Sequence, residues 1–198
     1  MQRVKVFILL VILFAAGVIL YSETDNNTTQ ITEIKSAETN AITVTPIPIG
    51  LPERLVIESL GVEATVEGVG LNAEGSMDIP KDVYNVAWYN LGYKPGEIGN
   101  AVIAGHLDTQ TGDPSVFYNL LSMREGERIK VIDNLGNTYT FKVVNIASYP
   151  HDEFPLVEVF GDYAKKRLNL ITCGGDWNRN AQNYSHRTVV YSELEHQR

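Results

Sequence analysis

The chain has 198 residues, which gives room for one good-sized domain and an appendage. Its formal net charge is −8, and all 24 acidic residues follow position 21, whereas two of the 16 basic residues precede it. Because phosphate groups are neutralised by clustered lysine and arginine, this acidic balance argues against nucleic acid or anionic lipid as a partner of the body of the protein. The single cysteine excludes an internal disulfide framework.

Residues 1–21 contain an N-terminal apolar segment. Arg3 and Lys5 precede an uninterrupted apolar run over 6–21, and the polar sequence SETD follows it. Two interpretations are open, a cleaved signal peptide and an uncleaved signal anchor. As a helix the run would reach about 24 Å, which is short of a ~30 Å hydrocarbon core and favours the signal peptide.

The position of the small residues favours the anchor instead. Ala15, Ala16 and Gly17 lie inside the apolar run, and no Ala-x-Ala cleavage site precedes the polar segment. We therefore predict a single-pass cell-membrane anchor over residues 1–21, with the N-terminus inside because the basic residues flank that end. The rest of the chain would then be extracytoplasmic.

Residues 22–49 have the composition of a flexible extracytoplasmic linker. They are rich in Thr, Asn, Glu and Ser and contain no aromatic side chain. From residue 50 the composition changes to short apolar runs separated by Gly, Pro and Asn. We therefore predict a folded domain over residues 50–198.

The domain is predicted to be all-β. Short apolar runs at a spacing of about ten residues, with turn residues between them, are typical of a barrel or sandwich. Strands are expected at 55–58, 64–69, 77–79, 83–88, 101–106, 128–133, 138–147, 167–173 and 187–194. The alternating runs 128–133 and 138–147 predict a hairpin. The wholly apolar run 101–104 predicts a central strand that is covered on both faces.

Two short helices are expected between the strands. Asp113 can cap a helix and Pro114 suits its first position, so residues 115–123 are predicted to be helical. A weaker helical pattern covers residues 154–166.

Cys173 is predicted to lie at the end of a strand. Asn169, Ile171 and Cys173 share one face by alternation, and Gly174-Gly175 is expected to end the strand. A lone cysteine is usually a small buried apolar residue. However, a strand that ends in Cys-Gly-Gly places the sulfur at a rim where backbone N–H groups can approach the atom it attacks. In an exported protein, an unpaired thiol also indicates reactivity or intermolecular pairing.

Two further side chains are candidates for the same site, although each taken alone is more often structural. His106 follows the apolar run 101–104, and a thiol with a pKa of ~8.5 needs such a neighbour to form thiolate at neutral pH. Arg187 opens the last strand. If the last two strands pair antiparallel, its guanidinium comes near Cys173, where it can stabilise an oxyanion. Arg179, in the intervening loop, is the competing arginine.

The remaining histidines, His151, His186 and His196, are interpreted as solvated surface residues. His186 should face away from Cys173, because adjacent residues of a strand point to opposite faces. The sequence contains no Cys-x-x-Cys, no His-Glu-x-x-His and no calcium-loop spacing of acids. We therefore predict no metal and no cofactor.

Together these motifs resemble those of the sortases. The resemblance covers residues 52–194 and rests on NAVIAGHLD at 100–108, LITC at 170–173 and RTVVYSEL at 187–194. It implies an eight-stranded β-barrel with short helices, and a cysteine transpeptidase that cuts a sorting signal of the Leu-Pro-x-Thr-Gly kind. Cys-Gly-Gly followed by the aromatic Trp177 is similar to the class F branch.

The resemblance also implies roles for individual residues. Cys173 would be the nucleophile, His106 the general acid and base, and Arg187 the oxyanion-stabilising or substrate-orienting group. Thr172, Gly174 and Asp108 would support the site or bind substrate. The loop over 149–166 would embrace the Leu-Pro part of the signal. The implied partners are proteins with a C-terminal sorting signal and an amine of a cell-wall precursor or pilin in a Gram-positive bacterium.

Two other functions are compatible with these residues. A membrane-tethered cysteine peptidase would release the same thioacyl intermediate to water, and the sequence does not separate it from a transpeptidase. A non-catalytic β-domain for adhesion or peptide binding would make Cys173 structural, but it leaves the joint presence of His106, Cys173 and Arg187 unexplained.

Overall fold

The computed structural model describes residues 47–195. The predicted anchor over 1–21, most of the predicted linker over 22–49, and His196 lie outside the described residues. Within the described range no helix combines the length and the apolar character needed to cross a membrane.

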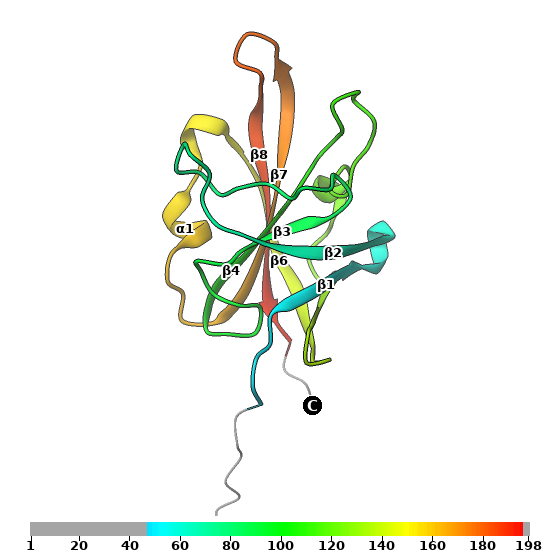
Figure 1. Cartoon of the computed structure of the whole chain (residues 1–198), viewed down its shortest axis with the longest axis vertical. Helices are drawn as coiled ribbons and strands as arrows, with labels where there is room; N and C mark the ends of the chain where they lie inside the picture. Colours follow the sequence, from blue (N-terminus) through cyan, green and yellow to red (C-terminus); the bar gives the residue numbers. More distant parts are fainter. Residues whose placement is uncertain (1–46, 196–198) are drawn as a thin grey trace, which may run out of the picture. The chain divides into compact units, whose positions relative to one another are not determined.

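Eight strands form a closed barrel, which confirms the predicted fold class (Figure 1). The order around the barrel is β1-β2-β3-β4-β7-β8-β6-β5, and β5 pairs with β1 to close it. Only the β2–β3 and β4–β7 pairs are parallel. The strands are β1 (Pro52–Ile57), β2 (Val62–Val69), β3 (Val86–Tyr89), β4 (Gly99–Gly105), β5 (Arg128–Asp133), β6 (Thr138–Pro150), β7 (Lys166–Asn178) and β8 (Asn183–Leu194).

Alternation along the strands sorts the apolar side chains into two clusters. Ile103, Leu170 and Val190 lie side by side on β4, β7 and β8 and are fully buried inside the barrel. Residues of opposite parity, such as Ile171, lie in an outer cluster that also includes Val159. The prediction that β4 is central and covered on both faces is therefore confirmed. Full burial of one such aliphatic side chain contributes about 1.5–3 kcal/mol to the free energy of folding.

The helix α1 (Leu156–Phe160) covers the outer cluster and is held by two buried asparagines. Asn100 Nδ2 donates to the carbonyls of Glu158 and Gly161 at 3.1 and 2.8 Å, and Asn169 Nδ2 donates to the Val159 carbonyl at 2.8 Å. A helix this short leaves most of its carbonyls without an intrahelical partner. The asparagines of β4 and β7 satisfy these carbonyls and fix α1 over the barrel.

Three predicted elements are wrong. Residues 77–79 form no strand, because only Met77 makes an isolated bridge, to Leu71. The predicted helix over 115–123 contains only the 3-10 turn η2 (Leu120–Ser122), because its first N–H groups bond back to the loop after β4. The predicted helix over 154–166 is limited to α1. The 3-10 turns η1 (Glu58–Leu60) and η3 (His151–Glu153) were not predicted.

Gly174 and Gly175 do not end β7, contrary to the prediction. The strand continues to residue 178 and stays paired with β8, where Trp177 lies opposite Tyr184. The register shifts between Gly174 and Trp177, and Gly175 has a φ of 73°, a left-handed conformation that favours glycine. The glycines therefore form a β-bulge, and the β7–β8 hairpin projects beyond the rest of the barrel (Figure 1).

Candidate active site

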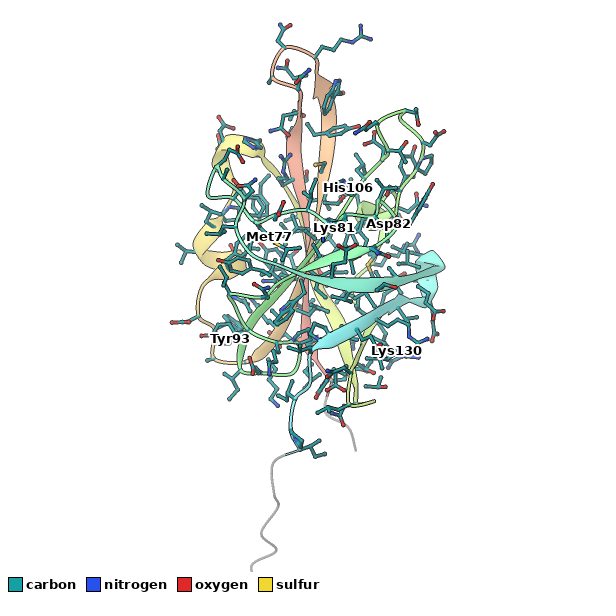
Figure 2. The ribbon with its side chains drawn as sticks, viewed as in Figure 1. Met77, Lys81, Asp82, Tyr93, His106 and Lys130 are labelled. Carbon is teal, nitrogen blue, oxygen red and sulfur yellow. The ribbon has the colours of Figure 1, made fainter. Side chains whose placement is uncertain are left out.

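The candidate site lies where β4 stops and the β7–β8 pair continues. The last residues paired across β4, β7 and β8 are Ala104, Ile171 and Val189, which all lie in or against the outer cluster. Two positions closer to the hairpin lie His106 after β4, Cys173 on β7 and Arg187 on the antiparallel β8, and Cys173 lies directly opposite Arg187. Residues opposite one another in an antiparallel pair have Cβ atoms about 4.5–5.5 Å apart. Figure 2 shows His106 at the barrel end from which the hairpin projects.

Thr172 ties the end of β4 to β7 beside the site. It is buried, and its Oγ1 donates to the Gly105 carbonyl at 2.9 Å. A Cβ on Gly105 would lie 2.6 Å from the Phe117 ring, so only glycine fits there. The Phe117 N–H donates to the His106 carbonyl at 2.9 Å. These contacts hold the backbone of His106 next to β7 at the level of Cys173.

Cys173 is an unpaired, half-buried cysteine. Burial raises the pKa of its thiol above the ordinary value, the Arg187 guanidinium opposes this rise, and the Asp108 carboxylate adds to it. The thiol is therefore protonated at neutral pH. A nucleophilic role consequently needs a group that takes the proton, and His106 is the neighbouring residue that can do so.

Arg187 is fixed by the hairpin that carries it. Its Nη1 donates to the carbonyls of His186 and Tyr184 at 2.9 and 3.3 Å, and its Nη2 donates to Asn183 Oδ1 at 2.8 Å. None of the ion pairs within residues 47–195 includes Arg187. Its positive charge therefore faces Cys173 without a carboxylate partner among the described residues, in a position suited to a developing oxyanion.

Arg179, the alternative arginine, is exposed in the turn between β7 and β8. The turn lies beyond the β-bulge, on the far side of the paired residues that follow Cys173. The geometry therefore favours Arg187, and its role in catalysis stays a prediction.

Asp108 and Tyr184 connect the loop after β4 to the hairpin. The Tyr184 hydroxyl donates to the Asp108 carboxylate, and this hydrogen bond raises the pKa of Tyr184 to about 12. The Trp177 ring contacts the Tyr184 ring with centroids 5.1 Å apart. The sequence alone does not identify Tyr184, because its approach to Asp108 depends on the β-bulge.

The other predicted residues have varied outcomes. Gly174 is buried, and a Cβ there would lie 3.0 Å from Thr188 Oγ1. His151 is exposed, as predicted. His186 is half-buried, with Nδ1 2.8 Å from Ser185 Oγ, so the prediction that it is solvated is wrong. It pairs with Gly174, and alternation directs it away from the face of Cys173.

No metal centre is evident in this part of the chain. Between residues 47 and 195, no three side chains of His, Cys, Asp or Glu lie close enough together to hold an ion.

The family model of the sortase domain matches residues 55–195. The fold is similar to sortase C-1 of Actinomyces oris, with a TM-score of 0.56, 22% identity and 73% of each chain covered. It is also similar to sortase A of Listeria monocytogenes, with a TM-score of 0.56 and 21% identity over 75% of this chain and 89% of that one.

Sortase A of Corynebacterium diphtheriae is a third similar structure, with a TM-score of 0.57 and 18% identity over 76% of this chain and 63% of that one. No curated protein matches the sequence. At these identities the structural similarity concerns the fold. The three structures described above are named as sortases A and C, and the likeness to class F stays a prediction.

Proposed function

The chain belongs to the sortase family of cysteine transpeptidases, and on this basis we propose that it cuts a Leu-Pro-x-Thr-Gly type signal and joins the cut protein to an amine. The amine would belong to a cell-wall precursor or a pilin. The observation that carries the residue roles is the juxtaposition of His106, Cys173 and Arg187 where β4 stops. The motif Cys-Gly-Gly followed by Trp177 supports class F.

In the first half of the reaction, the Cys173 proton passes to His106 and the thiolate attacks the carbonyl carbon of the signal's threonine. The guanidinium of Arg187 stabilises the oxyanion. His106 then gives its proton to the departing glycine nitrogen, the C–N bond breaks, and the threonine carbonyl remains bonded to the sulfur as a thioester.

In the second half, an amine attacks the thioester carbon. The C–S bond breaks, an amide forms, and the proton returns through His106 to the thiol. Water in place of the amine would give a carboxylic acid and make the protein a peptidase. The family membership of the chain supports the amine.

The signal would lie along the outer face of the barrel beside α1. Two apolar side chains of α1, Leu156 and Val157, are 65% and 85% exposed next to the outer cluster. Exposed apolar groups at this place suit the Leu-Pro part of a signal. The apolar run over 6–21 supports the proposal that the protein is anchored in the cell membrane with its barrel outside.

Product analysis tests the proposed function. The full-length chain is incubated with a peptide that contains Leu-Pro-Glu-Thr-Gly, with and without triglycine amide. A transpeptidase gives the amine-joined product when the amine is present, whereas a peptidase gives only the acid under both conditions. Turnover that persists in Cys173→Ala would contradict both and leave Cys173 structural.

A further inference from the structure

Asp108 is a carboxylate at the site that has no basic partner in the part of the chain that the structure describes. Its Oδ2 accepts from the Tyr184 hydroxyl, and within residues 47–195 no lysine, arginine or histidine forms an ion pair with it. Asp108 is half-buried, and it is close enough to Cys173 to raise the pKa of the thiol. A carboxylate in this place opposes thiolate formation, so it does not favour the first half of the reaction.

The loop after β4 holds Asp108 beside His106. Asp108 bridges Pro114 across the loop, and the Ser115 N–H donates to the Leu107 carbonyl at 3.0 Å. The hydroxyl of Tyr184 fixes the carboxylate from the other side. Because Tyr184 is a neutral donor, the negative charge of Asp108 is retained, and the second oxygen has no partner among the described residues.

This arrangement suits the second half of the reaction. A peptide α-amino group has a pKa of about 7.7–8.0, so an acceptor amine is mostly ammonium at neutral pH. Resting on the proposed function, we propose that Asp108 binds the protonated acceptor amine and delivers it to the thioester from the side of His106. Tyr184 is the positioning residue that orients the carboxylate.

The bound ammonium gives one proton to neutral His106, which releases it to solvent. The freed nitrogen lone pair attacks the thioester carbon, a C–N bond forms, and the C–S bond to Cys173 breaks. His106 takes the second proton from the nitrogen and passes it to the sulfur, which restores the thiol.

The test compares two nucleophiles that meet the same thioester. Triglycine amide is mostly cationic at pH 7, whereas hydroxylamine is uncharged at that pH. The full-length chain and a Leu-Pro-Glu-Thr-Gly peptide are used, and the partition between transfer and hydrolysis is measured against nucleophile concentration. This partition follows acylation, so it does not depend on the thiol pKa.

Asp108→Asn keeps an acceptor for the Tyr184 hydroxyl and removes the charge. We expect it to raise the half-saturating concentration of triglycine amide by about tenfold, in line with the loss of a charge-assisted hydrogen bond. The value for hydroxylamine should change by less than about twofold, because no charge attraction is lost. Tyr184→Phe should change the triglycine amide value in the same direction but less, and Asp108→Glu should recover part of it.

Asp113→Asn is the matched control, because Asp113 is an exposed carboxylate of the same loop, and it should leave both values unchanged. An equal loss with both nucleophiles in Asp108→Asn would overturn the proposal and assign Asp108 a structural role. An unchanged triglycine amide value would also overturn it. If the unsubstituted chain forms neither hydroxamate nor acid, the proposed function itself is wrong and this proposal fails with it.

Discussion

At the scale of single residues, the environment of Cys173 sets when its thiol can react. Burial and Asp108 raise the thiol pKa, and Arg187 lowers it. Cys173 is the only cysteine, so alkylation by iodoacetamide reports on this thiol alone. We predict that the alkylation rate rises with pH with a midpoint above the ordinary ~8.5.

Two variants test how the charges near Cys173 shift the pH midpoint of its alkylation. Arg187→Ala removes the cation and should move the midpoint further up, whereas Asp108→Asn removes the anion and should move it down. Alkylation midpoints that do not change, or that move in the opposite directions, would contradict the predicted effect of these two charges on the thiol pKa.

The planar fork of Arg187 is a separate requirement from its charge. Arg187→Lys keeps the charge but loses the donors that reach His186, Tyr184 and Asn183. We predict that turnover of a signal peptide falls about 10²-fold, while the alkylation midpoint stays close to that of the original protein. Arg179→Lys in the exposed turn is the control. A larger loss from the control would transfer the role to Arg179.

At the scale of elements, the position of α1 depends on polar contacts to the barrel. Asn169→Ala removes the donor to the Val159 carbonyl and leaves that buried group unsatisfied, which should cost about 1–3 kcal/mol. We predict faster amide hydrogen exchange across residues 156–161. Asn119→Ala, at an exposed asparagine, is the control. Equal exchange in the two variants would show that apolar packing alone holds α1.

The elements also show where sequence reasoning succeeds. The β5–β6 hairpin was predicted because its side chains alternate with period two around a clear turn. The prediction of a helix over 115–123 was wrong, because its first backbone N–H groups donate to the loop after β4. Local helix propensity gives no indication of these contacts. The prediction that β7 ends at Gly174-Gly175 was wrong, because two adjacent glycines can form a β-bulge within a strand as well as end it.

In the candidate site, the positions of Arg187, His106 and Tyr184 differ in how far the sequence predicts them. Pairing of the last two strands was sufficient to place Arg187 opposite Cys173. The position of His106 beside β7 required the resemblance to a known family, because a parallel β4–β7 pair has no local signal in the sequence. Tyr184 was missed because the bulge decides which residues of the hairpin face Asp108.

At the scale of the whole molecule, the chain enters the barrel at the end opposite the site (Figure 1). There the Gly50 N–H donates to Asp133 Oδ2 at 2.8 Å, and the Leu51 N–H donates to Asn134 Oδ1 at 2.9 Å. Asn137 Nδ2 donates to the Pro48 carbonyl at 3.1 Å. These bonds fasten residues 48–51 to the β5–β6 turn, next to the β1–β5 pair that closes the barrel.

Asp133 should make the stability of the barrel depend on pH. Burial alone raises the pKa of Asp133, but hydrogen bonds from Asn137, Gly50 and Leu135 outweigh it, so the pKa lies below the ordinary value. A lowered carboxyl pKa stabilises the fold above the unfolded-state pKa of ~3.9, and this contribution is lost as the pH falls through the folded-state pKa.

We therefore predict that Asp133→Asn lowers the free energy of unfolding by about 1–3 kcal/mol at pH 7. The difference should shrink below pH ~4, where the original carboxyl is protonated too. Urea denaturation of both proteins across this range measures it. A difference that is the same at every pH would contradict the ionised role of Asp133.

The central claim is that Cys173 forms a thioester with a sorting signal. Mass spectrometry of the full-length chain, incubated with a Leu-Pro-x-Thr-Gly peptide library with and without triglycine amide, tests it most directly. We predict a peptide fragment bonded to Cys173 and an amine-joined product, both absent from Cys173→Ala. An unmodified Cys173 across the whole library, with no product, would contradict the claim.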